Sequence, residues 1–190
     1  MNDLSSVVIA WARQFESEDI FVMIDTECFD QDYGKYVQIQ ITPNTLEATK
    51  VEIMIVDDTV GFTVECWSRL SRRMEYAIAA NDGKADMRVG AFLEPGVADV
   101  HRAACLLDAI VDGNIELEAR IHNNRLVGSS ANVRIGNEWE RLQGPATGSD
   151  LLRAVGLVRK VKLTCAQWPS GKISLTEMLS PLVGLGKPPV

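Results

Sequence analysis

Polar and apolar residues alternate with a period of two in several short segments, and this pattern constrains the fold more than any other feature. The clearest segments are YVQIQI (36–41), KVEIMIV (50–56) and IELEARIH (115–122). Successive side chains of a β-strand point to opposite faces, so each segment predicts a strand with one apolar and one polar face. The apolar faces require a second layer that covers them.

Short turn sequences separate the first four predicted strands. The strands are 19–24, 36–41, 50–56 and 61–67, and the sequences DQDYG, TPN and DDTVG lie between them. Strands joined by such short turns pair as antiparallel neighbours, which predicts a meander. Further strands are predicted over 87–93, 114–122 and 125–135.

Helical periodicity appears between these strands. A first helix is predicted from an apolar stripe at helical spacing, which consists of Leu4, Val8, Trp11 and Phe15. Residues 97–112 predict the best-defined helix, which ends before Gly113. Residues 68–82 predict another, although CWSRL could instead extend the preceding strand. The fold class is therefore α+β, an antiparallel meander sheet with helices packed on one face.

The sequence GPATGS (144–149) is the one plausible internal boundary, because it is rich in Gly, Pro and small polar residues. We expect an α+β core domain over 1–144 and a C-terminal extension over 145–190, packed on the same domain. The extension is predicted as a short helix followed by a hairpin, LTCAQW–PSG–KISL. Arg159, Lys160 and Lys162 would suit the negative C-terminal end of that helix.

Charge is unevenly distributed along the chain. Residues 1–100 hold 8 Lys/Arg against 18 Asp/Glu (−10), and residues 101–190 hold 11 against 8 (+3), which together give the net charge of −7. Residues 16–32 contain seven acids and no base. Such an excess repels phosphate backbones and argues against nucleic-acid binding. It favours a partner with a basic surface, a cation, or solubility alone.

The spacing of the cysteines and the composition of the N-terminus indicate the cellular compartment of the protein. The four cysteines, Cys28, Cys66, Cys105 and Cys165, are far apart and form no Cys-x-x-Cys pair. This spacing predicts reduced thiols in a cytoplasmic protein, with two disulfides in a secreted protein as the alternative. The N-terminal apolar run is interrupted by Arg13 and Gln14, so neither a signal peptide nor a membrane-spanning helix is expected.

The densest acidic stretch is IDTECFDQDYGKY (24–36), with Asp25, Glu27, Asp30 and Asp32. It fails the test for a calcium loop, because counting from Asp30 places Lys35 at position six and Ile41 at position twelve. Acids around a turn are solvated, so raised pKa values for acid–base chemistry are not expected. We interpret the stretch as a solvated hairpin that a basic partner could bind.

A second candidate lies on the helix predicted over 97–112. His101, Cys105, Asp108 and Asp112 fall on one edge of it. His-x-x-x-Cys could supply two ligands to zinc, but a closed site needs two more. No metal and no cofactor are predicted, and a polar helix flank is the simpler interpretation.

A third candidate is the group Trp67, Arg69, Arg72 and Arg73. On a helix the three arginines would share one side, with Trp67 beside them. Arg and Trp are enriched where proteins bind other proteins, and Arg also binds phosphate or carboxylate. A solvated helix face is the alternative.

No catalytic motif is intact. VGSSANV lacks the second Gly of a nucleophile elbow, and SGKIS lacks the first Gly and the Ser or Thr of a phosphate loop. Cys66 shares the apolar face of its strand with Phe62 and Val64, which is typical of a core residue.

Two hypotheses of function remain. The first is a non-enzymatic acidic protein-binding module, of the general class of immunity proteins, antitoxins or chaperones, whose partner has a basic surface. Its predicted binding residues are Asp25, Glu27, Asp30, Asp32, Trp67, Arg69, Arg72 and Arg73. The alternative is a small-molecule-binding or enzymatic domain with a pocket between sheet and helices. The sequence leaves homo-oligomerisation open.

Overall fold

The computed structural model describes residues 3–44, 49–69, 86–122, 125–146, 157–165, 167–169 and 171–182. Its helices are α1 (Asp3–Arg13), α3 (Val100–Val111) and α5 (Leu175–Leu179). The first five strands are β1 (Ile20–Asp30), β2 (Gly34–Pro43), β3 (Thr49–Val56), β4 (Thr59–Arg69) and β5 (Asp86–Leu93). The other four are β6 (Ile115–His122), β7 (Arg125–Ile135), β8 (Glu138–Ala146) and β9 (Arg159–Thr164).

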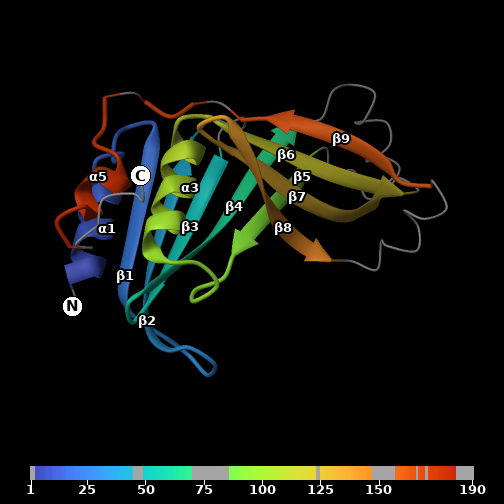
Figure 1. The fold of residues 1–190 in the computed structure, drawn as a ribbon. Coiled ribbons are helices and arrows are strands. Elements are labelled where there is room, and N and C mark those ends of the chain that lie inside the picture. The colour runs from blue at the N-terminus through green and yellow to red at the C-terminus, as the bar shows by residue number, and fades with distance from the viewer. Residues whose placement is uncertain are drawn as a thin grey trace.

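The strands form one antiparallel sheet in the order β1-β2-β3-β4-β5-β8-β7-β6-β9 (Figure 1). Strands β1 to β4 follow each other as the predicted meander, and β5 pairs next to β4. A second group, β8-β7-β6-β9, continues the sheet beyond β5. Consequently β1 and β9 are the two outermost strands.

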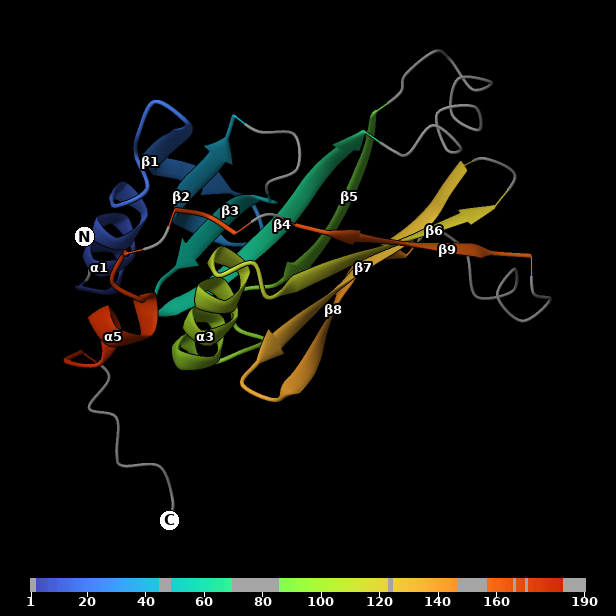
Figure 2. The same cartoon turned by 90° about the horizontal axis from the view of Figure 1, so that it is seen from above.

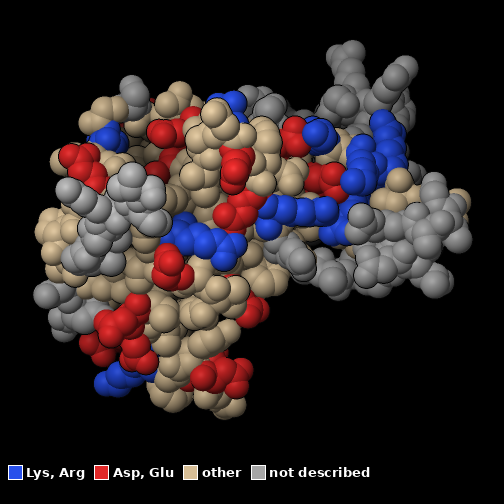
Figure 3. All heavy atoms as spheres, viewed as in Figure 1, with Lys and Arg blue, Asp and Glu red and all other residues tan. Residues whose placement is uncertain are grey.

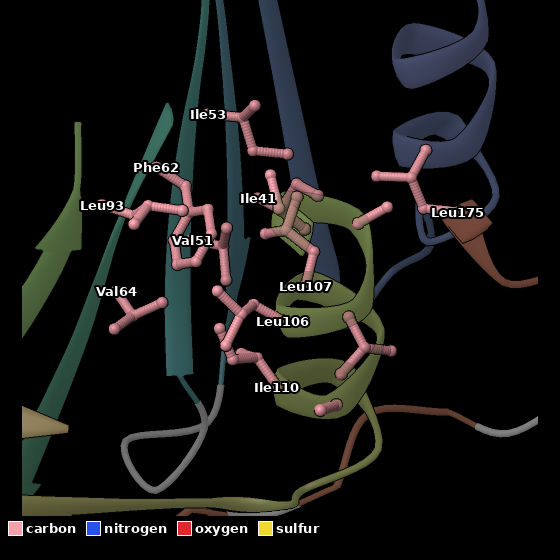
Figure 4. Packing of buried hydrophobic residues seen from close by; sticks show 14 of the residues in the cluster. Ile41, Val51, Ile53, Phe62, Val64, Leu93, Leu106, Leu107, Ile110 and Leu175 are labelled. Atoms are coloured by element: carbon pink, nitrogen blue, oxygen red, sulfur yellow. The ribbon is translucent and has the colours of Figure 1, made fainter. Parts of the chain in front are cut away.

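The helices lie on one face of the sheet, as predicted (Figure 2). The strands bury one set of alternating side chains, which includes Ile39, Ile41, Val51, Ile53, Phe62 and Val64. The helix α3 packs on this face and buries Ala103, Ala104, Leu106, Leu107, Ala109, Ile110 and Val111 (Figure 4). The α+β prediction is confirmed, because an antiparallel sheet carries helices on one face (Figure 2).

The helix α3 begins at Val100, three residues after the predicted start at 97, and both of its ends have a local cause. The carboxylate of Asp99 accepts a hydrogen bond from the backbone N–H of Arg102 and caps the N-terminus. Gly113 follows the helix with φ of 75°, the left-handed conformation that commonly ends helices. Within the described residues no helix covers the opposite sheet face, here called the open face. It carries Gln38, Glu52 and Thr63.

The two strand groups meet where β5, β7 and β8 approach closely. Among the described residues of β5 and β8, only Phe92 and Gln143 pair. Beside this pair, the Ser129 hydroxyl donates to the carbonyl oxygen of Gly90. A Cβ atom on Gly144 would lie 2.5 Å from the carbonyl oxygens of both Gly90 and Ser129. A glycine is required here because the backbones leave no room for a side chain.

The structure decides between the two interpretations of CWSRL. Ser68 and Arg69 continue β4 and pair with Met87 and Asp86 of β5, so the segment extends the strand. The rest of the predicted helix, residues 70–82, lies outside the described residues. The predicted Asn123-Asn124 turn does so as well.

The C-terminal hairpin prediction is wrong. Residues 159–164 form β9 and pair with β6, and Leu175, predicted as a strand residue, begins α5. Lys160 and Lys162 therefore lie in a strand and not at a helix end. The backbone of RKVKLT pairs with the outer side of β6. The predicted division between residues 144 and 145 falls within β8, and the packing of a C-terminal extension on the same domain stays a prediction.

Replacing Gly144 tests the junction between the strand groups. Gly144→Ala is expected to lower the free energy of unfolding by about 1–3 kcal/mol, because the new Cβ overlaps two backbone oxygens. Urea denaturation followed by circular dichroism measures it. Asn137→Ala, in the exposed β7–β8 turn, is the control and should change stability by less than about 0.5 kcal/mol. An unchanged urea midpoint for Gly144→Ala would contradict the packing described.

Candidate functional site

The acidic stretch forms the outermost hairpin of the sheet. We call residues 20–43, which comprise β1, the turn 31–33 and β2, the acidic hairpin. Asp25 and Glu27 lie in β1 at an irregularity in the pairing, and Asp30 and Asp32 lie at the turn. Two local hydrogen bonds shape it: the Asp25 carboxylate accepts from the Glu27 amide at 2.9 Å, and the Asp30 carboxylate accepts from the Asp32 amide at 2.8 Å. The predicted hairpin is thus confirmed.

The acids of residues 16–32 are unpaired in the described part of the chain. Six of the seven are exposed and Asp30 is half-buried, and none forms an ion pair with a described Lys or Arg. Three acids of β6 and β8 differ. Lys162 lies 2.8 Å from Glu116, Lys160 lies 3.0 Å from Glu118, and Arg102 pairs with Glu140.

The surface view shows the same division of charge. In Figure 3, Lys and Arg side chains gather over the end of the molecule that holds β6 and β9. Acidic side chains predominate over the end that holds α1, β1 and β2. The charge asymmetry of the sequence therefore becomes an asymmetry between the two ends of one sheet.

Large apolar side chains accompany the unpaired acids. Phe21 and Phe29 in β1 are 61% and 70% exposed, and Tyr33 in the turn is 41% exposed. Met23 is also exposed and lies on the same sheet face as Phe21. These residues were not predicted from the sequence, although the near-continuous apolar run of β1 indicates that both of its faces carry apolar side chains.

Two side chains of the acidic hairpin, Cys28 and Tyr36, have raised pKa values. Desolvation, and then the neighbouring Asp25 carboxylate, raises the pKa of the Cys28 thiol. Desolvation, the Cys28 thiolate and the carboxylates of Asp30 and Glu52 raise the pKa of Tyr36. Both shifts favour the neutral form. Cys28 is therefore a poorer nucleophile at neutral pH than an ordinary cysteine.

The Trp67 and Arg cluster is not assembled by the described structure. Trp67 and Arg69 lie in β4 and pair with Arg88 and Asp86, and their spacing along a strand differs from the predicted helix face. Arg72 and Arg73 lie outside the described residues. Their role in binding stays a prediction.

The cluster on α3 has a structural task. Asp108 accepts hydrogen bonds from the backbone amides of Leu175 and Thr176 at 2.6 and 2.9 Å, and from the Thr176 hydroxyl at 2.7 Å. It thereby caps the N-terminus of α5. The Sγ atom of Cys105 lies 3.8 Å from the Nε2 atom of the exposed His101. No group of three or more His, Cys, Asp or Glu in the described part of the chain is arranged to hold a metal ion.

The remaining predicted motifs have ordinary positions. VGSSANV lies within β7, where the Ser129 hydroxyl is engaged with Gly90. Cys28 and Cys105 are free thiols. Cys66 occupies the position in β4 that alternates with the buried Phe62 and Val64, and its side chain lies outside the description.

Two cavities stand out, and neither lies in the layer between sheet and helices. One, of about 190 Å³, is bordered by Trp11, Asp108 and Lys172 beside α1 and α3. The other, of about 170 Å³, lies on the open face between the β1–β2 turn and the end of β5. The predicted pocket between sheet and helices stays a prediction.

Among the described residues, none of the helices has the length and apolar character that crossing a membrane requires. Comparison of the chain with protein-family models, curated proteins and solved structures finds no match.

The capping role of Asp108 can be tested against its neighbour on the same helix. Asp108→Ala is expected to lower the free energy of unfolding by about 1–3 kcal/mol, because three donors of α5 lose their acceptor. Hydrogen exchange at the Leu175 and Thr176 amides should accelerate as well. Asp112→Ala is the control, since this side chain is exposed, and should cost less than about 0.5 kcal/mol. Equal effects of the two substitutions would contradict the assignment.

Proposed function

We propose that this chain is a non-enzymatic protein-binding module whose acidic hairpin binds a partner with a basic surface. One observation carries the proposal. The acids of residues 16–32 have no described Lys or Arg partner, whereas Glu116, Glu118 and Glu140 each have one. Unpaired like charges repel each other and accelerate the approach of an oppositely charged partner.

The apolar residues of the hairpin would supply the affinity that exposed charges lack. An exposed ion pair contributes only about 0–1 kcal/mol. Exposed aromatic side chains bury large areas on binding and dominate the energetics of many interfaces. Phe21, Phe29 and Tyr33 are placed among the acids, so a basic partner surface with apolar contacts fits this hairpin.

A protective role of the charges is the main alternative. Outermost strands carry charged residues that prevent edge-to-edge aggregation. That role explains acids on β1, but exposed Phe21 and Phe29 on the same strand would oppose it. Binding accounts for both features.

An immunity protein, an antitoxin or a chaperone is each compatible with the proposal, and a reducing cytoplasmic compartment suits the free thiols. The absence of nucleic-acid binding follows from the same charge argument.

Neutralising the hairpin tests the proposal with a defined probe, a fluorescein-labelled peptide of alternating Lys and Thr. Asp25→Asn/Glu27→Gln should weaken binding about 2- to 30-fold, from two exposed charge contacts. Asn can still accept the hydrogen bond from the amide of residue 27, so the hairpin shape is retained. The affinity is measured by fluorescence anisotropy at low and at physiological salt.

The control variant, Asp112→Asn/Glu138→Gln, removes the same charge from exposed positions outside the hairpin. It should bind the peptide as tightly as the unmodified protein. If both double variants bind equally, or if a Glu/Thr peptide binds as well as the Lys/Thr peptide, the hairpin is not the docking site.

A further inference from the structure

The cavity of about 170 Å³ on the open face adjoins the acidic hairpin. Its floor includes Met54 and Thr63 of the sheet, and Tyr33 and Tyr36 border it at the β1–β2 end. Opposite them lie Phe92 and the segment Glu94–Pro95 that follows β5. Tyr33 belongs both to the hairpin turn and to the cavity, so a partner on the hairpin also reaches the cavity.

The wall opposite the hairpin is fixed by close packing. A Cβ atom on Gly61 would lie 2.4 Å from the Cδ atom of Pro95, so the proline ring sits directly on the backbone of β4. This contact holds Glu94 and Pro95 over the open face. The cavity is therefore built by the β5–α3 connection and does not result from a loose side chain.

The lining combines aromatic rings with carboxylates. Tyr33, Tyr36 and Phe92 contribute rings, and Glu52 and Glu94 contribute acids. The Glu52 carboxylate accepts a hydrogen bond from the Gln38 amide. Neither acid forms an ion pair with any Lys or Arg that the structure describes. The described residues that line the cavity thus carry no positive charge, and a carboxylate lies on either side of the cavity.

A cation suits such a lining for two physical reasons. A Lys or Arg head group over an aromatic face is attracted by the ring quadrupole, and a nearby carboxylate adds Coulomb attraction. The apolar stem of a long basic side chain can meanwhile contact Met54 and the rings. An anion would face two carboxylates and is excluded by charge.

The volume of the cavity limits its occupant to one side chain. Pockets for drug-sized ligands measure about 300–1,000 Å³, whereas a cavity of about 150 Å³ holds a benzene molecule. At about 170 Å³ this cavity fits a single long side chain.

We infer that the cavity receives one Lys or Arg side chain of the basic partner, and that Glu52, Glu94 and the three rings hold it. This inference rests on the proposed function, because the side chain is presented by the protein docked on the acidic hairpin. The hairpin acids attract the partner over a wide area, and the cavity fixes its position.

Two methionines allow the hairpin and the cavity to be observed separately. Met23 lies on β1, and Met54 lines the cavity. Methyl-labelled protein is titrated with the Lys/Thr peptide, with the same peptide carrying acetyl-lysine, and with free ethylammonium. We expect the Lys/Thr peptide to shift both methyl signals, and the acetylated peptide and ethylammonium to leave the Met54 signal unshifted at the same concentration.

Variants of the cavity test its chemistry. Glu52→Gln removes the charge and can still accept the Gln38 hydrogen bond, and Phe92→Leu keeps an apolar side chain without the ring. Each should weaken peptide binding about 2- to 30-fold, from the loss of a cation contact. The Met23 shift should persist at saturating peptide. Glu138→Gln is the charge-matched control and should bind normally.

The outcomes separate the two proposals. A shift of Met23 without Met54 overturns the cavity inference and leaves the hairpin proposal standing. A shift of neither signal overturns both. An equal Met54 response to the acetylated peptide overturns the inference because charge is then not recognised, and an equal response to ethylammonium overturns it in favour of a free small cation.

Discussion

The packing of α3 against the sheet is the contact on which the rest of the structure depends. This helix contacts β4 in the first strand group and β7 in the second. Between the two groups, the part of β5 and β8 that the structure describes shares only one backbone pair, Phe92 with Gln143. The buried side of α3 therefore joins two groups of strands that backbone pairing alone connects weakly. Burial of apolar area is the main favourable term in folding, so one helix can supply this connection.

The two ends of the sheet then differ in whether their charged side chains are paired. At the β9 end, Lys160 and Lys162 lie beside Glu118 and Glu116, so charges of opposite sign offset each other. At the β1 end, acids stand among exposed aromatic side chains with no described base. An outermost strand of this composition lacks the internal partners that stabilise the other end, which is why we place the interaction surface there.

Local patterns predicted most of the first strand group and both longer helices. The alternation in β2, β3 and β6 reflects a property of each strand by itself, since neighbouring side chains point to opposite faces. The failures occurred where a residue's role depends on distant contacts. Gly144 was interpreted as part of an internal boundary, but it lies in β8 against Gly90 and Ser129. Leu175 was assigned to a hairpin strand, but it begins α5, whose N-terminus is capped locally by Ser174 and also by Asp108, 67 residues away in sequence.

The candidate site likewise combines features that follow from local sequence with features that depend on distant contacts. The sequence by itself determined the acidic hairpin, the apolar faces and the charge asymmetry, because each follows from residues adjacent in the chain. Only the tertiary structure decided that β1 is outermost, that its acids lack described partners, and that Tyr33 lies across a cavity from Phe92. Strand order and cavity walls arise from contacts between segments far apart in sequence, and alternation specifies which face of a strand is buried but not which strand lies beside it.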